Sequence, residues 1–118
     1  MRTAALVVLA LLLPVWTWAL VTPNPVPPAV EGLLGFWEHA KFAAAKSLHA
    51  GVYAALAGLG VYGLGPRWKF AVVGLMLHGV ATEIIQTAVP GRSGSVRDVL
   101  IDWAGIAVAT LVVRRWRP

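Results

Sequence analysis

Three short segments of this sequence carry polar residues whose types could do chemistry inside an otherwise apolar chain. The set comprises Lys46, His49, Tyr53, Glu83, Gln86, Arg92, Asp98 and Asp102. Carboxylates and an imidazole are the usual general acids and bases, and Glu83, His49 and Asp102 are therefore the catalytic candidates. Lysine and arginine bind phosphate or carboxylate anions. The set thus predicts either a proton-transfer site or an anion-binding site.

The spacing within each segment is helical. His49 and Tyr53 are four residues apart, Glu83 and Gln86 three, and Asp98 is four residues before the last acid. Each group therefore lies on one side of its helix. A carboxylate facing lipid is costly, so each group should face inward. We expect Lys46, Arg92 and Arg97 to pair with Glu83, Asp98 and Asp102 in a network of charge pairs and hydrogen bonds.

Four apolar runs must position these residues. Hydrophobic residues make up 58% of the 118-residue chain and charged residues 13%, whereas a soluble domain carries about 25% charged residues. The runs cover about residues 3–21, 46–65, 69–89 and 98–113, lengths near those that cross a hydrocarbon core of about 30 Å. The prediction is one domain, residues 1–118, that is all-α and forms an integral four-transmembrane-helix bundle.

The segments between and before the runs leave two alternatives open. Residues 22–28 contain four prolines and predict an extended connector. Residues 29–41 mix apolar and charged side chains, which fits an interfacial helix or an extramembrane turn of helix leading into the next run. The first run could be a cleaved signal peptide, but its length favours a retained helix.

Charge and cysteine usage exclude several classes of function. The sequence has no cysteine, which excludes disulfides, zinc–thiolate sites and thiol nucleophiles. The net charge of +5 includes Arg114, Arg115 and Arg117 directly after an apolar run, which predicts a topology anchor on anionic lipid and no nucleic-acid partner. Six basic residues against four at the alternate ends of the runs place both termini in the cytoplasm. His78 is expected to be a packing residue.

The polar segments resemble the VanZ-like family. Lys46-Ser-Leu-His49 followed by Tyr53 resembles its Asp-Lys-x-x-His-x-x-x-Tyr motif, with Ala45 in place of the aspartate. Glu83-Ile-Ile-Gln86 and Pro90-Gly91-Arg92 resemble its Glu-x-x-Gln and Pro-Gly-Arg motifs. Asp98-Val-Leu-Ile-Asp102-Trp-Ala-Gly105 resembles its Asp-x-x-x-Asn-x-x-Gly motif, with Asp102 in place of the asparagine.

The resemblance implies a protein of the bacterial cytoplasmic membrane, since the family is named for a protein linked to teicoplanin resistance. The first hypothesis is an envelope protein that binds or shields a lipid-linked cell-wall component or a glycopeptide-related ligand, with membrane lipids as partners. The alternatives are a membrane hydrolase or transferase using Glu83, His49 and Arg92, an accessory subunit of a membrane complex, and polar residues that only hold helices together. No motif requires a cofactor or metal, although Glu83, His49 and Asp98 could hold a divalent ion.

Overall fold

The apolar runs fold as helices because a backbone in apolar surroundings must satisfy its N–H and C=O groups within the segment. The computed structural model describes residues 1–22, 38–90 and 95–116, with side chains in the second range from residue 46 onward. Within these ranges there are four α-helices, one short 3-10 helix and no strand. They are α1 (Arg2–Val21), α3 (Glu38–Leu64), η1 (Gly65–Arg67), α4 (Trp68–Gln86) and α5 (Val96–Trp116).

The helices follow the predicted runs, but several of their ends differ. The helix α4 ends at Gln86, before the predicted end at residue 89. The helix α3 begins at Glu38, well before the expected start at residue 46, so residues 38–41 continue into it. The rest of the expected interfacial segment, and the proline-rich connector, lie outside the described residues. The helix α5 begins at Val96 and ends at Trp116, beyond the predicted range at both ends.

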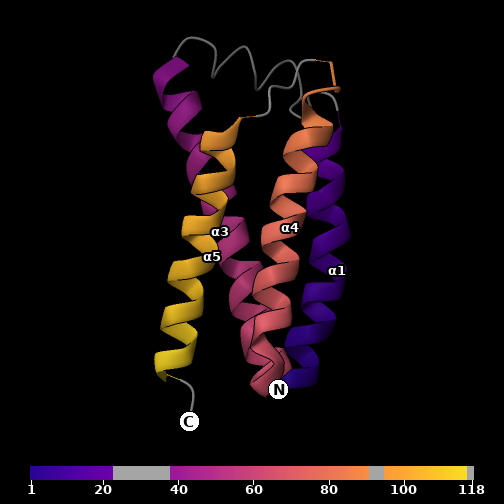
Figure 1. Ribbon diagram of the computed structural model, residues 1–118, viewed down its shortest axis with the longest axis vertical. Coiled ribbons are helices and arrows are strands. Elements are labelled where there is room, and N and C mark those ends of the chain that lie inside the picture. The colour runs from indigo at the N-terminus through magenta and orange to yellow at the C-terminus, as the bar shows by residue number, and fades with distance from the viewer. Residues whose placement is uncertain (23–37, 91–94, 117–118) are drawn as a thin grey trace.

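A tight turn joins α3 to α4. Gly65 has a φ of +56°, a left-handed conformation that glycine adopts without the Cβ clash of other residues. Pro66 then occupies the first turn of η1, where its missing N–H is no loss. This turn sends α4 back alongside α3 (Figure 1).

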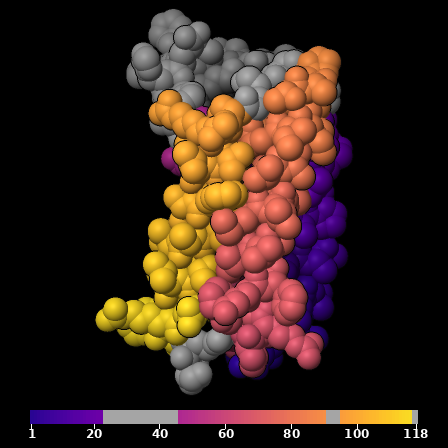
Figure 2. Space-filling model, in the orientation of Figure 1, coloured from indigo at the N-terminus to yellow at the C-terminus, as the bar shows by residue number. Residues whose placement is uncertain are grey.

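The helix α3 packs against each of the other three helices, and α4 also packs against α1 and α5. In Figure 1, α5 lies in front of α3 on one side of α4 and α1 lies on the other side, and the chain termini lie at the same end of the bundle. Figure 2 shows α4 and α5 side by side on one face, with α1 at its margin. The long axis of the molecule extends 47 Å, which exceeds the hydrocarbon thickness of about 30 Å.

The outer surface of the bundle is apolar along its length. Large side chains exposed there include Leu11, Val15, Leu77, Ile84, Val108 and Leu111. Two stretches of the described residues are long and apolar enough to cross a membrane: Arg2–Val21, and Lys46–Gln86, which contains most of α3 together with η1 and α4. The inside is a small core of Leu20, Tyr53, Leu56, Ala57, Leu75 and Ile106.

A glycine sets the distance between α3 and α5. A Cβ built on Gly105 would lie 2.4 Å from the backbone oxygen of Ala50, so only a residue without a side chain fits. Small residues allow helix backbones to approach in this way in membranes. Ala50 follows His49, and Gly105 is three residues after Asp102. The contact between Gly105 and Ala50 therefore holds the His49 and Asp102 side chains at similar heights along the bundle axis.

Candidate functional site

The polar residues gather at the end of the bundle opposite the termini. There α3 and α5 begin while α1 and α4 end (Figure 1). The acids are deeply placed: Glu83 is 5% exposed, Asp98 7% and Asp102 1%. The basic groups lie nearer the surface, since the side chain of Lys46 is 22% exposed and that of His49 15%. The site therefore has buried carboxylates behind two partly exposed basic groups.

Ser95 joins the start of α5 to α4. Its hydroxyl accepts a hydrogen bond from the Asp98 backbone N–H at 3.2 Å, as an N-cap residue does. Its own backbone N–H donates to Glu83 Oε2 at 2.8 Å. In a capping box the acid of the same helix would take that N–H. Here Glu83 takes it, which frees the Asp98 carboxylate for another partner.

That partner is Lys46 of α3. The Lys46 ammonium group forms an ion pair and hydrogen bond with Asp98 Oδ1. The pair crosses between the starts of two helices and neutralises an acid that would otherwise be buried alone. The sequence predicted charge pairs between three bases and three acids without assigning the partners, and this is one such pair.

His49, Glu83 and Asp102 form a second group, contributed by three different helices. One ligand-type atom from each residue lies within 4.8 Å of the others. His49 Nδ1 is 3.5 Å from Asp102 Oδ1, and both atoms are buried with no hydrogen-bond partner. Asp102 thus faces an imidazole rather than a lysine or arginine among the described residues. The possible metal set expected from sequence contained Asp98 in its place.

Tyr53 connects the site to the middle of the bundle. Its hydroxyl lies 2.9 Å from His78 Nδ1, and His78 Nε2 lies 2.7 Å from Thr17 Oγ1 of α1. The Thr17 hydroxyl donates to the Leu13 carbonyl, so His78 Nε2–H donates to Thr17. In a neutral imidazole Nδ1 then accepts from Tyr53. His78 therefore links three helices, as a packing histidine would.

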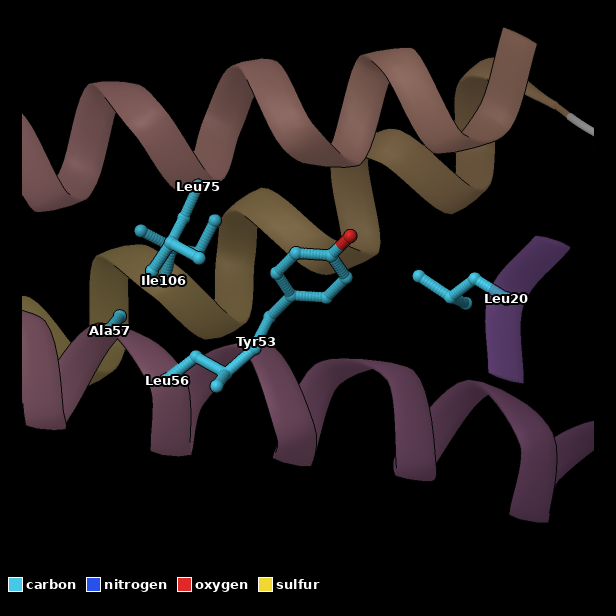
Figure 3. Packing of buried hydrophobic residues seen from close by; sticks show 6 residues of the cluster. All are labelled: Leu20, Tyr53, Leu56, Ala57, Leu75 and Ile106. Atoms are coloured by element: carbon cyan, nitrogen blue, oxygen red, sulfur yellow. The ribbon is translucent and has the colours of Figure 1, made fainter. Parts of the chain in front are cut away.

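Tyr53 also separates the polar site from the apolar interior. Its ring is fully buried and points from α3 into the bundle, with Leu20 on one side and Leu56, Ala57, Leu75 and Ile106 on the other (Figure 3). The hydroxyl is the polar tip of a side chain whose ring belongs to the core.

The helix α1 contributes to the site, which the sequence analysis did not anticipate. Gln86 donates to the backbone oxygen of Leu20 at 2.9 Å, so this predicted site residue ties α4 to α1. Trp16 packs edge-to-face on His49, with ring centroids 5.4 Å apart, and on Tyr53 at 6.1 Å. The topology could have predicted this contribution of α1, because in an up-and-down bundle the end of the first helix must lie beside the start of the second.

The remaining predicted residues have different outcomes. Arg92 lies outside the described residues. Arg97 is exposed at the first turn of α5. Among the described residues, the structure brings Lys46, His49, Tyr53, Glu83, Asp98 and Asp102 to one end of the bundle interior.

Comparison with known proteins identifies the family. A model of the VanZ/LLP1 family matches residues 3–117. The chain belongs to the VanZ/LLP1 family. Neither the curated proteins nor the solved structures gave a significant match.

Membership in the VanZ/LLP1 family covers all four described helices, since the match runs from α1 to the end of α5. It confirms the resemblance drawn from the three polar motifs. Together with the two long apolar segments, it supports a membrane location. It also links the chain, through the family name, to glycopeptide resistance.

Proposed function

We propose that this VanZ/LLP1 protein is a four-span protein of the bacterial cytoplasmic membrane that binds or shields a lipid-linked cell-wall component. The polar site would hold the anionic head group, and the apolar surface between helices would take the lipid chain. Binding of this kind would lower the access of teicoplanin to its target and contribute to glycopeptide tolerance.

The observation that carries the proposal is the arrangement of charged groups at the end of the bundle opposite the termini. Lys46 and His49 are partly exposed, whereas the carboxylates behind them are almost fully buried. An arriving phosphate or carboxylate would meet the basic groups first. Arg92, from the Pro-Gly-Arg motif, is proposed as a third basic contact.

The proposed topology places both termini in the cytoplasm and the site at the outer face. Its support is the clustering of Arg2, Arg67, Lys69, Arg114 and Arg115 at the ends of the helices that lie with the termini. Basic residues favour the cytoplasmic side of a membrane. The outer face is also where a glycopeptide meets cell-wall precursors.

The test is teicoplanin susceptibility of a sensitive bacterial host, combined with binding of a lipid-linked precursor to the purified protein. The wild type should protect and bind, and Arg92→Ala, which removes a proposed basic contact with the anion, should do neither at equal membrane levels. Gly74→Ala is the matched control, because a Cβ there meets nothing within 4 Å. Equal protection by the wild type and Arg92→Ala, or no binding by the wild type, would refute the proposal.

A second candidate is a membrane-embedded hydrolase or transferase. It is favoured by the convergence of His49, Glu83 and Asp102 within 4.8 Å, since two acids and an imidazole can share proton transfers. Mass spectrometry of a lipid-linked precursor incubated with the protein would detect its product. Turnover that persists unchanged in Glu83→Gln would exclude this mechanism.

A further inference from the structure

Two unsatisfied atoms face each other inside the site. His49 Nδ1 and Asp102 Oδ1 are buried, lie 3.5 Å apart and have no hydrogen-bond partner. Buried polar atoms are nearly always hydrogen-bonded, and an exception requires an explanation. Asp102 has the greater need for a partner, because it is 1% exposed and no hydrogen bond to its carboxylate is found among the described residues.

The third ligand-type side chain, Glu83, has spare capacity. Its Oε2 accepts the Ser95 N–H, and the other carboxylate oxygen makes no hydrogen bond within the described part of the chain. The three residues come from α3, α4 and α5. They are held by separate elements: the Gly105–Ala50 contact sets α5 against α3, and the Ser95 bond sets α4 against α5.

The geometry suits a small divalent ion. Zinc binds imidazole nitrogen and carboxylate oxygen at about 2.0–2.2 Å, which places tetrahedral ligands about 3.4 Å from one another. The distance from His49 Nδ1 to Asp102 Oδ1 is 3.5 Å. The largest separation in the group, up to 4.8 Å, would shorten by rotation of Glu83, the longest and most rotatable of the three side chains.

The ligand set also indicates which ions fit. One imidazole with two carboxylates suits zinc, manganese or iron better than the all-oxygen shells of calcium and magnesium. Three protein ligands leave a coordination position open for water or an anionic group. Trp16 packs on the His49 ring and fixes its orientation, and the 15% exposure of the His49 side chain gives a route of entry.

We propose that His49, Glu83 and Asp102 bind one divalent transition-metal ion. The ion occupies the space between the two unsatisfied atoms and neutralises the two buried carboxylates, while Asp98 stays paired with Lys46. This inference concerns the metal alone and does not depend on the lipid-linked ligand proposed above.

Asp102→Asn tests the charge of this ligand. It replaces an anionic ligand with a neutral amide of nearly the same shape. We expect this variant to stay folded and lose the metal.

The experiment is titration of purified, chelator-treated full-length protein in detergent with Zn²⁺ alone, followed by calorimetry and by elemental analysis after dialysis. The wild type should bind one equivalent per chain. Asp102→Asn, His49→Gln and Glu83→Gln should each weaken binding by at least about 100-fold, since changes even to outer-shell partners of a metal cost 10–100-fold.

Two matched controls distinguish binding at these three ligands from nonspecific attraction of zinc to nearby acidic residues. Asp98→Asn removes a neighbouring acid that is paired with Lys46, and it should weaken zinc binding much less than Asp102→Asn does. His78→Gln removes a partly buried histidine outside the ligand set and should bind zinc as the wild type does. Equal losses in Asp98→Asn and Asp102→Asn would overturn the proposal, because the ion would then be responding to charge alone.

A measurement on the wild type guards against variants that misfold. In ¹⁵N-histidine NMR, zinc should shift the ring nitrogens of one of the three imidazoles, and His49→Gln should identify that signal. Absence of stoichiometric binding, or of any shifted imidazole, would overturn the metal site. Neither result depends on teicoplanin or lipid binding, so failure of one proposal leaves the other to its own test.

Discussion

At the residue scale, the bundle interior depends on hydrogen bonds that each connect two helices. Tyr53 of α3 bonds to His78 of α4, which bonds to Thr17 of α1. Gln86 of α4 bonds to the Leu20 carbonyl of α1. If one partner of such a bond is removed, the other polar group is left without a hydrogen bond inside the bundle. The loss of stability is then larger than the net contribution of the bond itself.

Tyr53→Phe should therefore destabilise the protein. The ring still fills its place, but His78 Nδ1 loses its donor and stays in a partly buried position. The expected loss is about 1 kcal/mol, because an unsatisfied buried acceptor costs about 1–3 kcal/mol while interhelical hydrogen bonds in membranes average about 0.6 kcal/mol. Equilibrium unfolding in mixed detergent micelles measures it.

Tyr62→Phe is the matched control in the same helix. No hydrogen bond from the Tyr62 hydroxyl is found among the described residues, so its removal should change the unfolding free energy little. If the two variants were equally stable, the hydrogen bond from Tyr53 to His78 would contribute nothing measurable.

At the element scale, the approach of α5 to α3 determines which acid meets which base. Gly105 packs against the Ala50 backbone. This contact sets the position of α5 along the axis of α3, and so places Asp102 beside His49 and Asp98 beside Lys46. Gly105→Ala should force the helices apart and cost at least about 2 kcal/mol, as overpacking of a tight contact does. Detergent unfolding again provides the measurement.

Gly74→Ala supplies the comparison for that prediction. Its added methyl group meets nothing within 4 Å, and alanine is the better helix former by about 1 kcal/mol. This variant should be as stable as the wild type or more so. A similar loss in both variants would show that the loss in Gly105→Ala does not come from its contact with Ala50.

The sequence was sufficient to predict the elements and the polar faces. Long apolar runs with few charges identified the helices, and spacings of three and four predicted that the acids and bases lie on inward faces. Helical periodicity gives the direction of a side chain but not its height relative to a neighbouring helix. The partners of Asp98 and Asp102 therefore depended on the Gly105 contact, which only the structure provides. Charge patterns also gave no sign of Trp16 or Thr17, because α1 carries no charge after Arg2.

At the scale of the whole molecule, the two ends of the bundle differ in charge chemistry. The site end buries three acids, whereas the end with the termini carries basic residues around Trp68. The Arg114 guanidinium lies 4.3 Å from the Trp68 ring centroid, a cation–π distance. A tryptophan beside arginine and lysine is typical of a membrane interface.

The proposed topology predicts opposite labelling at the two ends. The chain has no cysteine, so Ala88→Cys and Trp116→Cys each introduce a single thiol at an exposed position. A membrane-impermeant maleimide should label Ala88→Cys in intact cells, or spheroplasts where an outer membrane intervenes, and Trp116→Cys only after permeabilisation. The reverse pattern would invert the orientation, and labelling of both from outside would contradict an even number of crossings.

The double role of Ser95 has a consequence for solvent exchange. Ser95 is exposed, yet its backbone N–H donates a hydrogen bond to Glu83 Oε2. A deuterium-exchange measurement should find this amide slower than its exposed surroundings suggest, and faster when the Glu83 side chain turns toward another partner. The exchange rate of one backbone hydrogen would thus report the state of a carboxylate in the site, without a label or a ligand.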